Sequence, residues 1–435
     1  MHIPPAFPFQ IFRSSGRAGL AAVFGLLALL ATPSMHAAKV CDVRAFGAKG
    51  DGVTKDTAAI QAAVDSCAQS GGVVELSSGT YLSAPIVLKS RIMLQLDKGA
   101  TLQGSADHAD YPEKTEFRAP GLQSLVSATN AENITIRGEG TIDGGGESWW
   151  EQSRAFKDSG VLGSEHTRPR LVVFDHCKHV TVEGVTIQNS PMWQLVLYYS
   201  DDVTIRNIRV LAPARSPNTD AIDPFSSSHV RIEHVLADVG DDNIAIKSGA
   251  IGSSGPDEPS HDITIADCTF LHGHGLSIGS EIAGGANHIT AERIQFNGTD
   301  NGIRIKANRD RGNDVGNLVF RNIEMKNVTN ALVISEYYPK MLPPDTEAAQ
   351  PVTRLTPHFH DIVIENLNAT GSAVAGVIAG LPEAPVMGVK LDNVSIEARQ
   401  GLTIGYAQVL SKNLQVKAAQ GQGIEKRIGA EFALQ

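Results

Sequence analysis

Carboxylates, a histidine and two cations recur at nearly even intervals through the middle of the chain. They lie in four short motifs: Asn218-Thr219-Asp220, Gly240-Asp241-Asp242, Gly273-His274-Gly275 and Arg304-Ile305-Lys306. The spacing is roughly 20 to 35 residues, the length of one coil in a solenoid of stacked repeats. Because stacked parallel strands lie about 4.8 Å apart, we expect the four motifs to meet on one face of one groove.

The acidic residues of these motifs are suited to acid/base chemistry. A glycosidic bond is cut by one protonated carboxyl group and one carboxylate, and Asp220, Asp241 and Asp242 are the candidates. Asp220 and Asp241 are 21 residues apart, so they are expected to face each other from neighbouring strands. Crowded like charges raise the pKa of one group, which keeps it protonated as a general acid. An isolated pair such as Asp201-Asp202 more often marks a solvated turn.

The same spacing indicates roles for the histidine and for the two cations. Glycines on both sides of His274 permit close approach of a ligand, although a single histidine among 14 usually packs or lies in a turn. Arg304 and Lys306 are two residues apart in a strand-like run and therefore point to the same side. Such a pair usually marks a solvated face. About one coil beyond His274, it predicts a clamp for a carboxylate of the substrate.

Short runs rich in β-branched residues recur along the chain and must carry these motifs. Alternating aliphatic residues follow a polar one at 133–136, 179–182, 202–205, 229–232 and 262–265, among others. Their typical step of roughly 23 to 33 residues is too long for a hairpin and predicts one coil of a right-handed parallel β-helix. A β-propeller is the competing architecture, but its blades need about 40 or more residues.

We therefore expect an all-β chain, a single-stranded right-handed parallel β-helix with a short N-terminal capping helix. The helix is expected at 57–67, with Asp56 as its N-cap. Three stretches are longer than one coil: 107–125, 149–170 and 337–357. They are either rims of a binding cleft or ordinary surface loops.

The first residues differ in character from the rest. Arg13 and Arg17 precede an apolar run at 19–31, which is typical of a secretory signal peptide. The predicted organisation is a signal peptide at 1–37 and one β-helix domain at 38–435, secreted or periplasmic. A signal anchor is the alternative, although the run is short for a membrane span.

The net charge and the cysteines of the chain bear on three questions: nucleic-acid binding, disulfide formation and metal binding. The formal net charge of −10 argues against nucleic acid. A disulfide between Cys41 and Cys67 is plausible, whereas Cys177 and Cys268 are expected to be buried free thiols. No Cys/His spacing resembles a metal site, so no metal is expected.

Taken together, the four motifs resemble glycoside hydrolase family 28, the polygalacturonases. The resemblance runs from about Val43 to the end of the repeats and includes the flanking stretches 216–224, 240–249 and 273–281. It implies hydrolysis of α-1,4-galacturonosidic bonds of pectin or polygalacturonate with inversion, without a cofactor or metal. The implied partner is a pectic polysaccharide or an oligogalacturonide, bound by a monomer that is free of the membrane after signal removal.

The resemblance also implies residue roles. Asp241 would be the general acid, Asp220 and Asp242 would hold and deprotonate the attacking water, and His274 would support the acid. The implied substrate-binding residues are Asn218, Arg304, Lys306 and Tyr338, with Tyr337 as the rival of Tyr338. The chain departs from the family at Ala221, which replaces a usual glycine, at Asn243 and Phe270, which replace both halves of a disulfide, and at the charged segment 309–314.

Several functions remain as alternatives. A rhamnogalacturonan or xylogalacturonan hydrolase would use the same machinery. A calcium-dependent pectate lyase would cleave by elimination, and a non-catalytic β-helix adhesin would need no convergent carboxylates. Endo and exo attack are both open. If the three long insertions close one end of the groove, release from a chain terminus is favoured.

Overall fold

The computed structural model describes residues 39–117, 119–158, 167–342 and 346–434, and residues 38–435 group into one compact unit. The expected signal peptide at 1–37 lies outside the described residues. In the part of the chain that is described, neither helix has the length and apolar character needed to cross a membrane.

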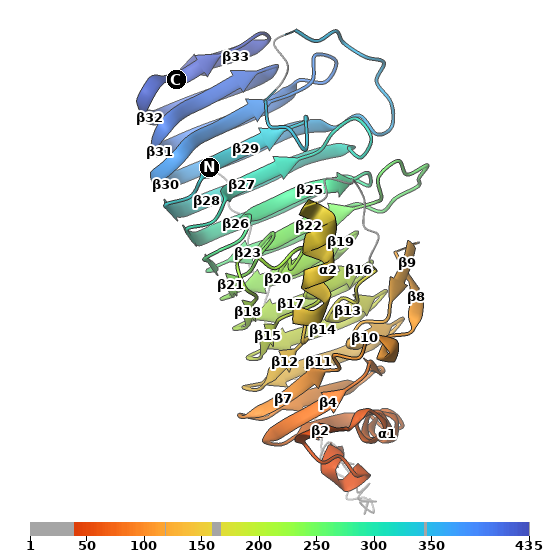
Figure 1. Cartoon of the computed structure of the whole chain (residues 1–435). Helices are drawn as coiled ribbons and strands as arrows, with labels where there is room; N and C mark the ends of the chain where they lie inside the picture. Colours follow the sequence, from red (N-terminus) through yellow and green to blue (C-terminus); the bar gives the residue numbers. More distant parts are fainter. Residues whose placement is uncertain (1–38, 118, 159–166, 343–345, 435) are drawn as a thin grey trace, which may run out of the picture. The chain divides into compact units, whose positions relative to one another are not determined.

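The described strands form a right-handed parallel β-helix, as predicted (Figure 1). Thirty-one of them join in one parallel sheet that winds around the coils, and β8–β9 is a separate antiparallel hairpin. The strands fall into three ladders, each made of one strand from every coil. From β26 onward the strands lengthen, and they then pass from one ladder to the next without a break.

The first ladder contains β1 (Lys39–Asp42), β3 (Gly72–Leu76), β6 (Ile92–Leu96), β11 (Glu132–Gly138), β14 (Lys178–Glu183), β17 (Asp201–Arg206), β20 (Ser228–Glu233), β23 (Ser260–Ala266), β26 (Ala286–Asn297), β28 (Asp314–Lys326), β30 (His358–Ala379), β31 (Val386–Gly405), β32 (Ala407–Lys426) and β33 (Ala430–Leu434). The second contains β2 (Asp51–Lys55), β4 (Gly79–Ser83), β7 (Ala100–Gly104), β12 (Thr141–Asp143), β15 (Thr186–Gln188), β18 (Arg209–Leu211), β21 (Leu236–Asp238) and β24 (Thr269–Phe270).

The third, here called the site ladder, contains β5 (Ile86–Val87), β10 (Val126–Thr129), β13 (Val172–Asp175), β16 (Leu195–Tyr198), β19 (Ile222–Phe225), β22 (Ile244–Ser248), β25 (Leu276–Ile282), β27 (Asn301–Lys306) and β29 (Asn330–Ser335). The remaining elements are η1 (Val43–Phe46), α1 (Thr57–Ala68), η2 (His108–Asp110), β8 (Glu113–Glu116), β9 (Ala119–Leu122) and α2 (Glu147–Asp158).

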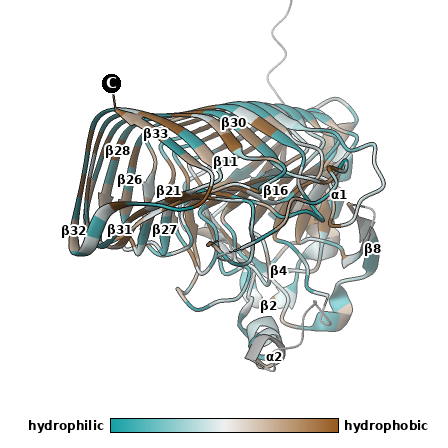
Figure 2. Ribbon diagram, turned by 90° about the horizontal axis from the view of Figure 1, so that it is seen from above, coloured by the Kyte–Doolittle hydropathy of each residue, from teal (hydrophilic) through white to brown (hydrophobic). Residues whose placement is uncertain are grey.

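Side chains alternate between the core and the groove along the site ladder. Ile222, Ile244 and Ile303 point inward and belong to the continuous aliphatic core. Because successive side chains of a strand point to opposite faces, their neighbours Asp223 and Arg304 point outward. Figure 2 shows the same alternation of hydrophobic and hydrophilic residues along the strands. Because the strands of successive coils pair in register, their outward residues lie next to one another along the ladder.

At the N-terminal end, the helix and the disulfide form as predicted from the sequence, but the hydrogen bonds of Asp56 differ from the prediction. The capping helix forms as α1, and Cys41 and Cys67 are joined by a disulfide with their Cα atoms 6.2 Å apart. The prediction that Asp56 caps α1 through its side chain is wrong. Its carboxylate instead accepts hydrogen bonds from the backbone N–H groups of Lys49 and Gly50, at 2.7 and 2.9 Å. The Asp56 carboxylate therefore binds the turn before the helix and not the first turn of α1.

Two of the long insertions pack on each other. The first holds η2 and the β8–β9 hairpin, and the second begins with α2. The rings of His108 and Trp149 stack at 3.5 Å, and Tyr111 meets Trp149 edge-on. Trp150 Nε1 donates to the carbonyl oxygen of Ser190, which ties α2 to the coil that precedes the motif Asn218-Thr219-Asp220.

Candidate active site

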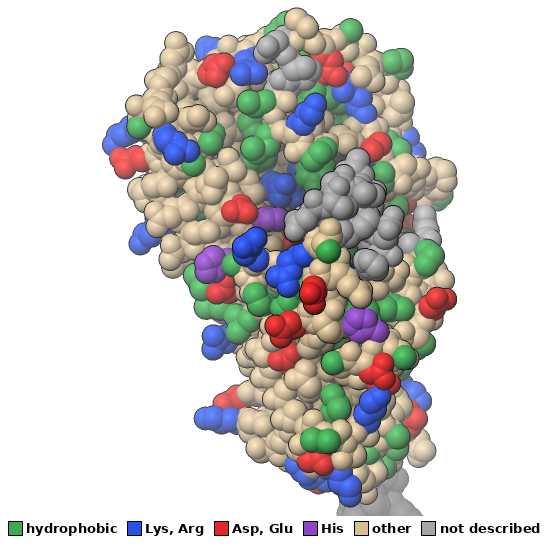
Figure 3. Space-filling view, in the orientation of Figure 1, with side chains coloured by type: hydrophobic (Ala, Val, Ile, Leu, Met, Phe, Trp, Pro, Cys, Tyr) green, Lys and Arg blue, Asp and Glu red, His purple; other side chains and the backbone are tan. Residues whose placement is uncertain are grey.

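The four motifs meet where the site ladder passes through β19, β22, β25 and β27. Their strands are consecutive neighbours, and Ala245 of β22 lies opposite Ser277 of β25, which lies opposite Arg304 of β27. Figure 3 shows acidic, basic and histidine side chains gathered around a recess at mid-height of the molecule. The expectation that one groove collects the motifs is met.

Asp241 and His274 form the accessible part of this cluster. Nδ1 of His274 lies 2.9 Å from Oδ1 of Asp241, and the backbone N–H of His274 donates to the Asp241 carbonyl oxygen at 2.9 Å. The Asp241 side chain keeps 14% of its surface exposed, whereas that of Asp242 keeps 2%. Burial opposes charge on His274, but its contact with Asp241 raises the pKa of the imidazole. The pair therefore places a carboxyl group and a cationic imidazole together at the groove surface.

Asp242 is a buried carboxylate held from three sides. Its Oδ2 accepts from Lys306 Nζ at 2.8 Å, and its Oδ1 accepts from Ser277 Oγ at 2.7 Å and faces Arg304 Nη1 at 3.5 Å. Two cations and a hydroxyl thus contact this carboxylate. In this structure Arg304 and Lys306 are directed at Asp242, so any clamp on a substrate carboxylate shares these cations with the protein.

Asp220 and Asp223 share a buried cation. Lys247 Nζ lies 3.8 Å from Asp220, 3.9 Å from Asp223 and 3.4 Å from Glu281. Burial, with Asp241 and Asp223 adding to it, raises the pKa of Asp220 well above its usual range. Burial also raises the pKa of Asp223, to about 8, against the opposing effect of Lys247. Burial opposes the charge of Lys247, yet Glu281 and Asp220 hold its pKa well above the ordinary value.

The register of the strands that follow Asp220 and Asp241 differs by one residue from the spacing of these two carboxylates in sequence. Ile222 lies opposite Ile244, an offset of 22 residues, and the Ala221 N–H donates to the Asp242 carbonyl oxygen at 2.9 Å. After burial, the charge of Asp241 raises the pKa of Asp220 most, ahead of Asp223 and Asp242, which agrees with the expected proximity of Asp220 and Asp241. The one-residue difference turns Asp241 toward the groove and leaves Asp242 beside the buried cations.

Close backbone packing explains the glycines around His274. Gly273 and Gly275 have φ values of 119° and 84°. A Cβ at Gly273 would lie 2.5 Å from the Asp241 carbonyl oxygen, and one at Gly275 would overlap the Asn301 carbonyl oxygen. Both positions need glycine for the histidine to reach Asp241.

Asn243 connects the same two motifs where the family carries half of a disulfide. Its Nδ2 donates to the His272 carbonyl oxygen at 2.8 Å, and its Oδ1 accepts from the Gly275 N–H at 3.0 Å. Phe270, at the other half, packs edge-on against Phe296. Hydrogen bonds and an aromatic contact thus occupy the positions of the missing bridge.

The structure separates the two candidate tyrosines. The ring of Tyr338 lies 5.8 Å from the Arg304 guanidinium carbon and 5.5 Å from Lys306 Nζ. Tyr337 packs against the aliphatic cluster of Val333 and neighbouring coils. Tyr338 is the one that reaches the site cations.

Asn218 is held in place by a cation from the second insertion. Its Oδ1 accepts from Arg168 Nη2 at 2.7 Å, and Arg168 Nη1 donates to the carbonyl oxygens of Pro191 and Pro217. Burial lowers the pKa of Arg168 to about 10. The end of the insertion at 149–170 therefore reaches the first motif.

Several site residues were not singled out from the sequence. They are Asp223, Lys247, Ser277, Glu281, Asp300 and Trp193. Asp223, Lys247, Ser277 and Glu281 lie inside the flanking stretches that carry the resemblance, and Lys247 is the single cation in an otherwise apolar strand. A cation at an outward position of a buried strand is the signal that could have found it.

One group in the site has donor atoms close enough for a metal ion. Side-chain ligand atoms of Asp241, Asp242 and His274 lie within 4.8 Å of one another. Lys306 and Arg304 already bind Asp242, and their positive charge opposes a bound cation. The arrangement fits acid/base chemistry better than metal binding.

Comparison with known proteins agrees with this geometry. A family model described as glycosyl hydrolases family 28 matches residues 69–418. The chain belongs to glycosyl hydrolase family 28. This family membership makes it a glycoside hydrolase.

Relatives within family 28 include enzymes of both attack modes. The chain is 34% identical over 301 residues to an endo-polygalacturonase of Pectobacterium carotovorum subsp. carotovorum, covering 65% of this chain and 72% of the relative. It is 30% identical over 374 residues to a polygalacturonase of Ralstonia solanacearum, covering 73% and 67%. The crystal structure of a hyperthermoactive exopolygalacturonase from Thermotoga maritima superposes with a TM-score of 0.74 at 28% identity, over 89% of this chain and 92% of that one.

Proposed function

We propose that this family 28 enzyme is a polygalacturonase that hydrolyses α-1,4-galacturonosidic bonds of polygalacturonate by an inverting acid/base mechanism, from a chain terminus. The observation that carries the proposal is the division of the carboxylates into an accessible Asp241 beside His274 and a buried Asp242 beside Lys306 and Arg304. Asp241 donates the proton to the leaving oxygen. Asp220 and Asp242 orient a water and remove its proton.

The cations support an anionic substrate. Arg304, Lys306 and Arg311 surround the ring of Tyr338 at 5.5 to 5.8 Å, beside the acid. This gives the groove local positive charge in a chain whose formal net charge is −10. A galacturonate carboxylate is the substrate group that such a cluster attracts.

An aromatic wall supports attack at a chain end. Tyr198 and Phe225 point outward from the site ladder, and Phe225 is the register partner of Lys247. Phe117, at the tip of the β8–β9 hairpin, covers them, with ring centroids 3.8 Å from Phe225 and 5.4 Å from Tyr198. Trp193 lies next to Phe225 and under Lys247. These rings lie on the N-terminal side of the carboxylates, and we propose that they end the groove there.

The groove continues on the other side of Arg304. A cavity of about 670 Å³ lies over Val333, Val377 and Thr403, which succeed Arg304 in register on the following coils. The charged residues of its lining, Glu425 and Arg427, pair with each other at 3.3 Å. The rest of a substrate chain leaves the site over this side.

That cavity favours a second candidate function. Its polar lining is supplied chiefly by amides, from Asn330, Gln400, Gln420 and Gln422. Amides suit neutral sugars as well as galacturonate. A rhamnogalacturonan or xylogalacturonan hydrolase is therefore the alternative.

We also infer export from the cell, supported by the charge and apolar pattern of residues 1–37. A monomer is proposed for the active form.

Product analysis tests the proposed activity and attack mode. On polygalacturonate, we expect one small product from the first turnovers and a slow fall in viscosity per bond broken. A steep early fall in viscosity would contradict attack at a terminus. Proton NMR of the first product should show inversion at the anomeric carbon. An unsaturated product would contradict hydrolysis, and faster turnover of rhamnogalacturonan or xylogalacturonan would establish the alternative.

A further inference from the structure

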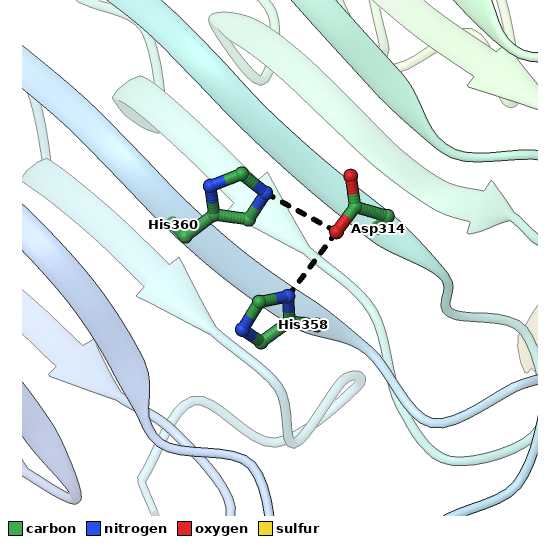
Figure 4. A group of neighbouring side chains, drawn as sticks. All are labelled: Asp314, His358 and His360. Atoms are coloured by element: carbon green, nitrogen blue, oxygen red, sulfur yellow. Dashed lines mark hydrogen bonds and ion pairs between the residues drawn. The ribbon is translucent and has the colours of Figure 1, made fainter.

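A second cluster of ligand-type side chains lies outside the catalytic region, where β30 begins beside β28. Asp314 is the first residue of β28, and His358 and His360 are the first and third residues of β30 (Figure 4). Register places Asp314 opposite His358. Because His358 and His360 are two residues apart in one strand, both rings lie on the same face as the carboxylate.

The donor atoms already have the separations that a small metal ion requires. Asp314 Oδ1 lies 3.2 Å from His358 Nδ1 and 3.1 Å from His360 Nε2, and all three atoms lie within 4.8 Å of one another. Zinc binds imidazole nitrogen and carboxylate oxygen at about 2.0–2.2 Å with tetrahedral angles, which puts neighbouring ligand atoms about 3.3 Å apart. Both measured separations fit a shared ion with little movement.

Surrounding residues orient the His360 ring for this purpose. Its Nδ1 lies 2.8 Å from Oδ2 of Asp361, which leaves Nε2 directed at Asp314. A carboxylate on the far nitrogen is the arrangement that fixes the orientation of metal-binding histidines. The ring lies over Gly316, where any Cβ would overlap it. The site thus has three ligands, an orienting carboxylate and a side open to solvent.

We propose that Asp314, His358 and His360 form a binding site for a divalent transition-metal ion of the zinc type. Two imidazoles and one carboxylate suit such an ion, whereas calcium and magnesium prefer oxygen ligands alone. The bound ion joins two successive coils where the chain returns from the insertion at 337–357. That return is also held by backbone bonds, from Gly312 to Leu355 and from His358 to Asn313, and by the ion pair of Arg354 with Asp257. Metal binding therefore stabilises the base of the insertion.

Zinc titration of the full chain tests the proposal. Calorimetry with Zn²⁺ at neutral pH should give one site in the micromolar range or tighter, with no matching site for Ca²⁺ or Mg²⁺. His360→Gln and Asp314→Asn should each weaken this site at least ten-fold, and Asp361→Asn should weaken it roughly ten-fold through the orientation of His360. His261→Gln is the matched control, because His261 pairs with Asp262 on an exposed strand in the same way.

Proteolysis gives a second readout that does not depend on activity. Zn²⁺ should slow cleavage within 337–357 in the native protein and leave the rate unchanged in His360→Gln. Unchanged zinc affinity in both ligand variants would overturn the proposal, and it would point to the group of Asp241, Asp242 and His274 instead. Binding that needs millimolar Zn²⁺ would also overturn it. Circular dichroism of each variant separates lost binding from lost folding.

Discussion

At the residue scale, the carboxylates of Asp241 and Asp242 differ in their exposure and in the residues that they contact. Asp241 is the accessible one and contacts His274, whereas Asp242 is buried and bound to Lys306. A proton donor must reach the leaving oxygen, and a water-activating carboxylate must stay ionised. The two neighbouring aspartates meet these opposite needs because strand register turns them in different directions.

The role of Asp241 gives the first prediction. Asp241→Asn should lower kcat on polygalacturonate by about 10²–10⁴-fold, since a general acid contributes that range. The melting temperature should change little. Reducing-end assays and thermal melts measure the two effects. Asp202→Asn, in the surface pair at 201–202, is the control and should keep normal turnover. Near-normal kcat in Asp241→Asn would assign the acid to another residue.

The two cations should differ in their effects. Arg304 keeps 18% of its side chain exposed, whereas Lys306 keeps 7% and lies 2.8 Å from Asp242. Arg304→Ala should therefore raise KM for polygalacturonate more than for methyl-esterified pectin, and flatten its salt dependence. Lys306→Met should chiefly lower kcat, because Asp242 loses its closest cation. Arg321→Ala, on an exposed strand, is the control. Equal losses on both substrates in Arg304→Ala would show a purely structural role.

The third prediction concerns Lys247 and the acidic limb of the pH profile of kcat/KM. In the proposed mechanism Asp220 acts only when ionised, so activity should fall as pH drops through its raised pKa. Lys247 lowers that pKa, and its removal must raise it further. Lys247→Met should shift the acidic limb of kcat/KM to higher pH and reduce the maximum. Rates between acidic and neutral pH measure the shift, with melting curves at each pH. A limb that stays in place would remove Asp220 from the role of base.

At the element scale, the proposed attack at a chain terminus depends on the β8–β9 hairpin. Its tip residue Phe117 covers Tyr198 and Phe225, although the hairpin lies about 100 residues before the catalytic motifs in sequence. The hairpin and α2 belong to insertions that pack on each other through His108 and Trp149. In the proposed mode of attack, these two insertions close one end of the groove.

Shortening this hairpin gives the fourth prediction. Replacing 113–122 by a short glycine-serine turn should allow longer oligogalacturonides to appear among early products, since the cover over Tyr198 is lost. Chromatography of products at low conversion measures the change. Phe117→Tyr is the matched control and should keep the original product pattern, because the ring stack remains. An unchanged pattern in the shortened variant would show that the hairpin does not limit binding.

At the scale of the whole molecule, each coil contacts mainly its neighbours, so the ends need protection. The helix α1 and the Cys41–Cys67 disulfide cover the first coil, whereas Cys177 and Cys268 are buried free thiols within the stack. Local stability in a solenoid is a sum over coils and interfaces. A constraint at one end therefore acts first on the coils beside it.

The disulfide gives the fifth prediction. Its partners are separated by 26 residues, and a loop of that size stabilises the folded chain by about 3.5 kcal/mol in the chain-entropy model. Replacing both Cys41 and Cys67 by Ala should lower the free energy of unfolding of the N-terminal coils by that order. Denaturant titration measures the loss. Reducing agent should destabilise the native protein and leave the variant unchanged. Equal sensitivity of both proteins to reductant would implicate the other thiols.

The sequence by itself determined the coil architecture and the meeting of the four motifs. Both depend on the spacing of short strands, which is a local property repeated along the chain. The helix over 57–67 and the pairing of Cys41 with Cys67 were predictable for the same reason, because each involves residues close in sequence.

Only the tertiary structure decided which side chains meet across coils. The offset of 22 residues between β19 and β22 places Ile222 opposite Ile244, and a one-residue error in coil length turns a side chain to the other face. Three contacts depend on how separate segments pack. The carboxylate of Asp56 binds the turn before α1, Lys247 lies between several carboxylates, and Phe117 covers Phe225. Spacing fixes which coils are neighbours, but burial and register choose the partner of each charge.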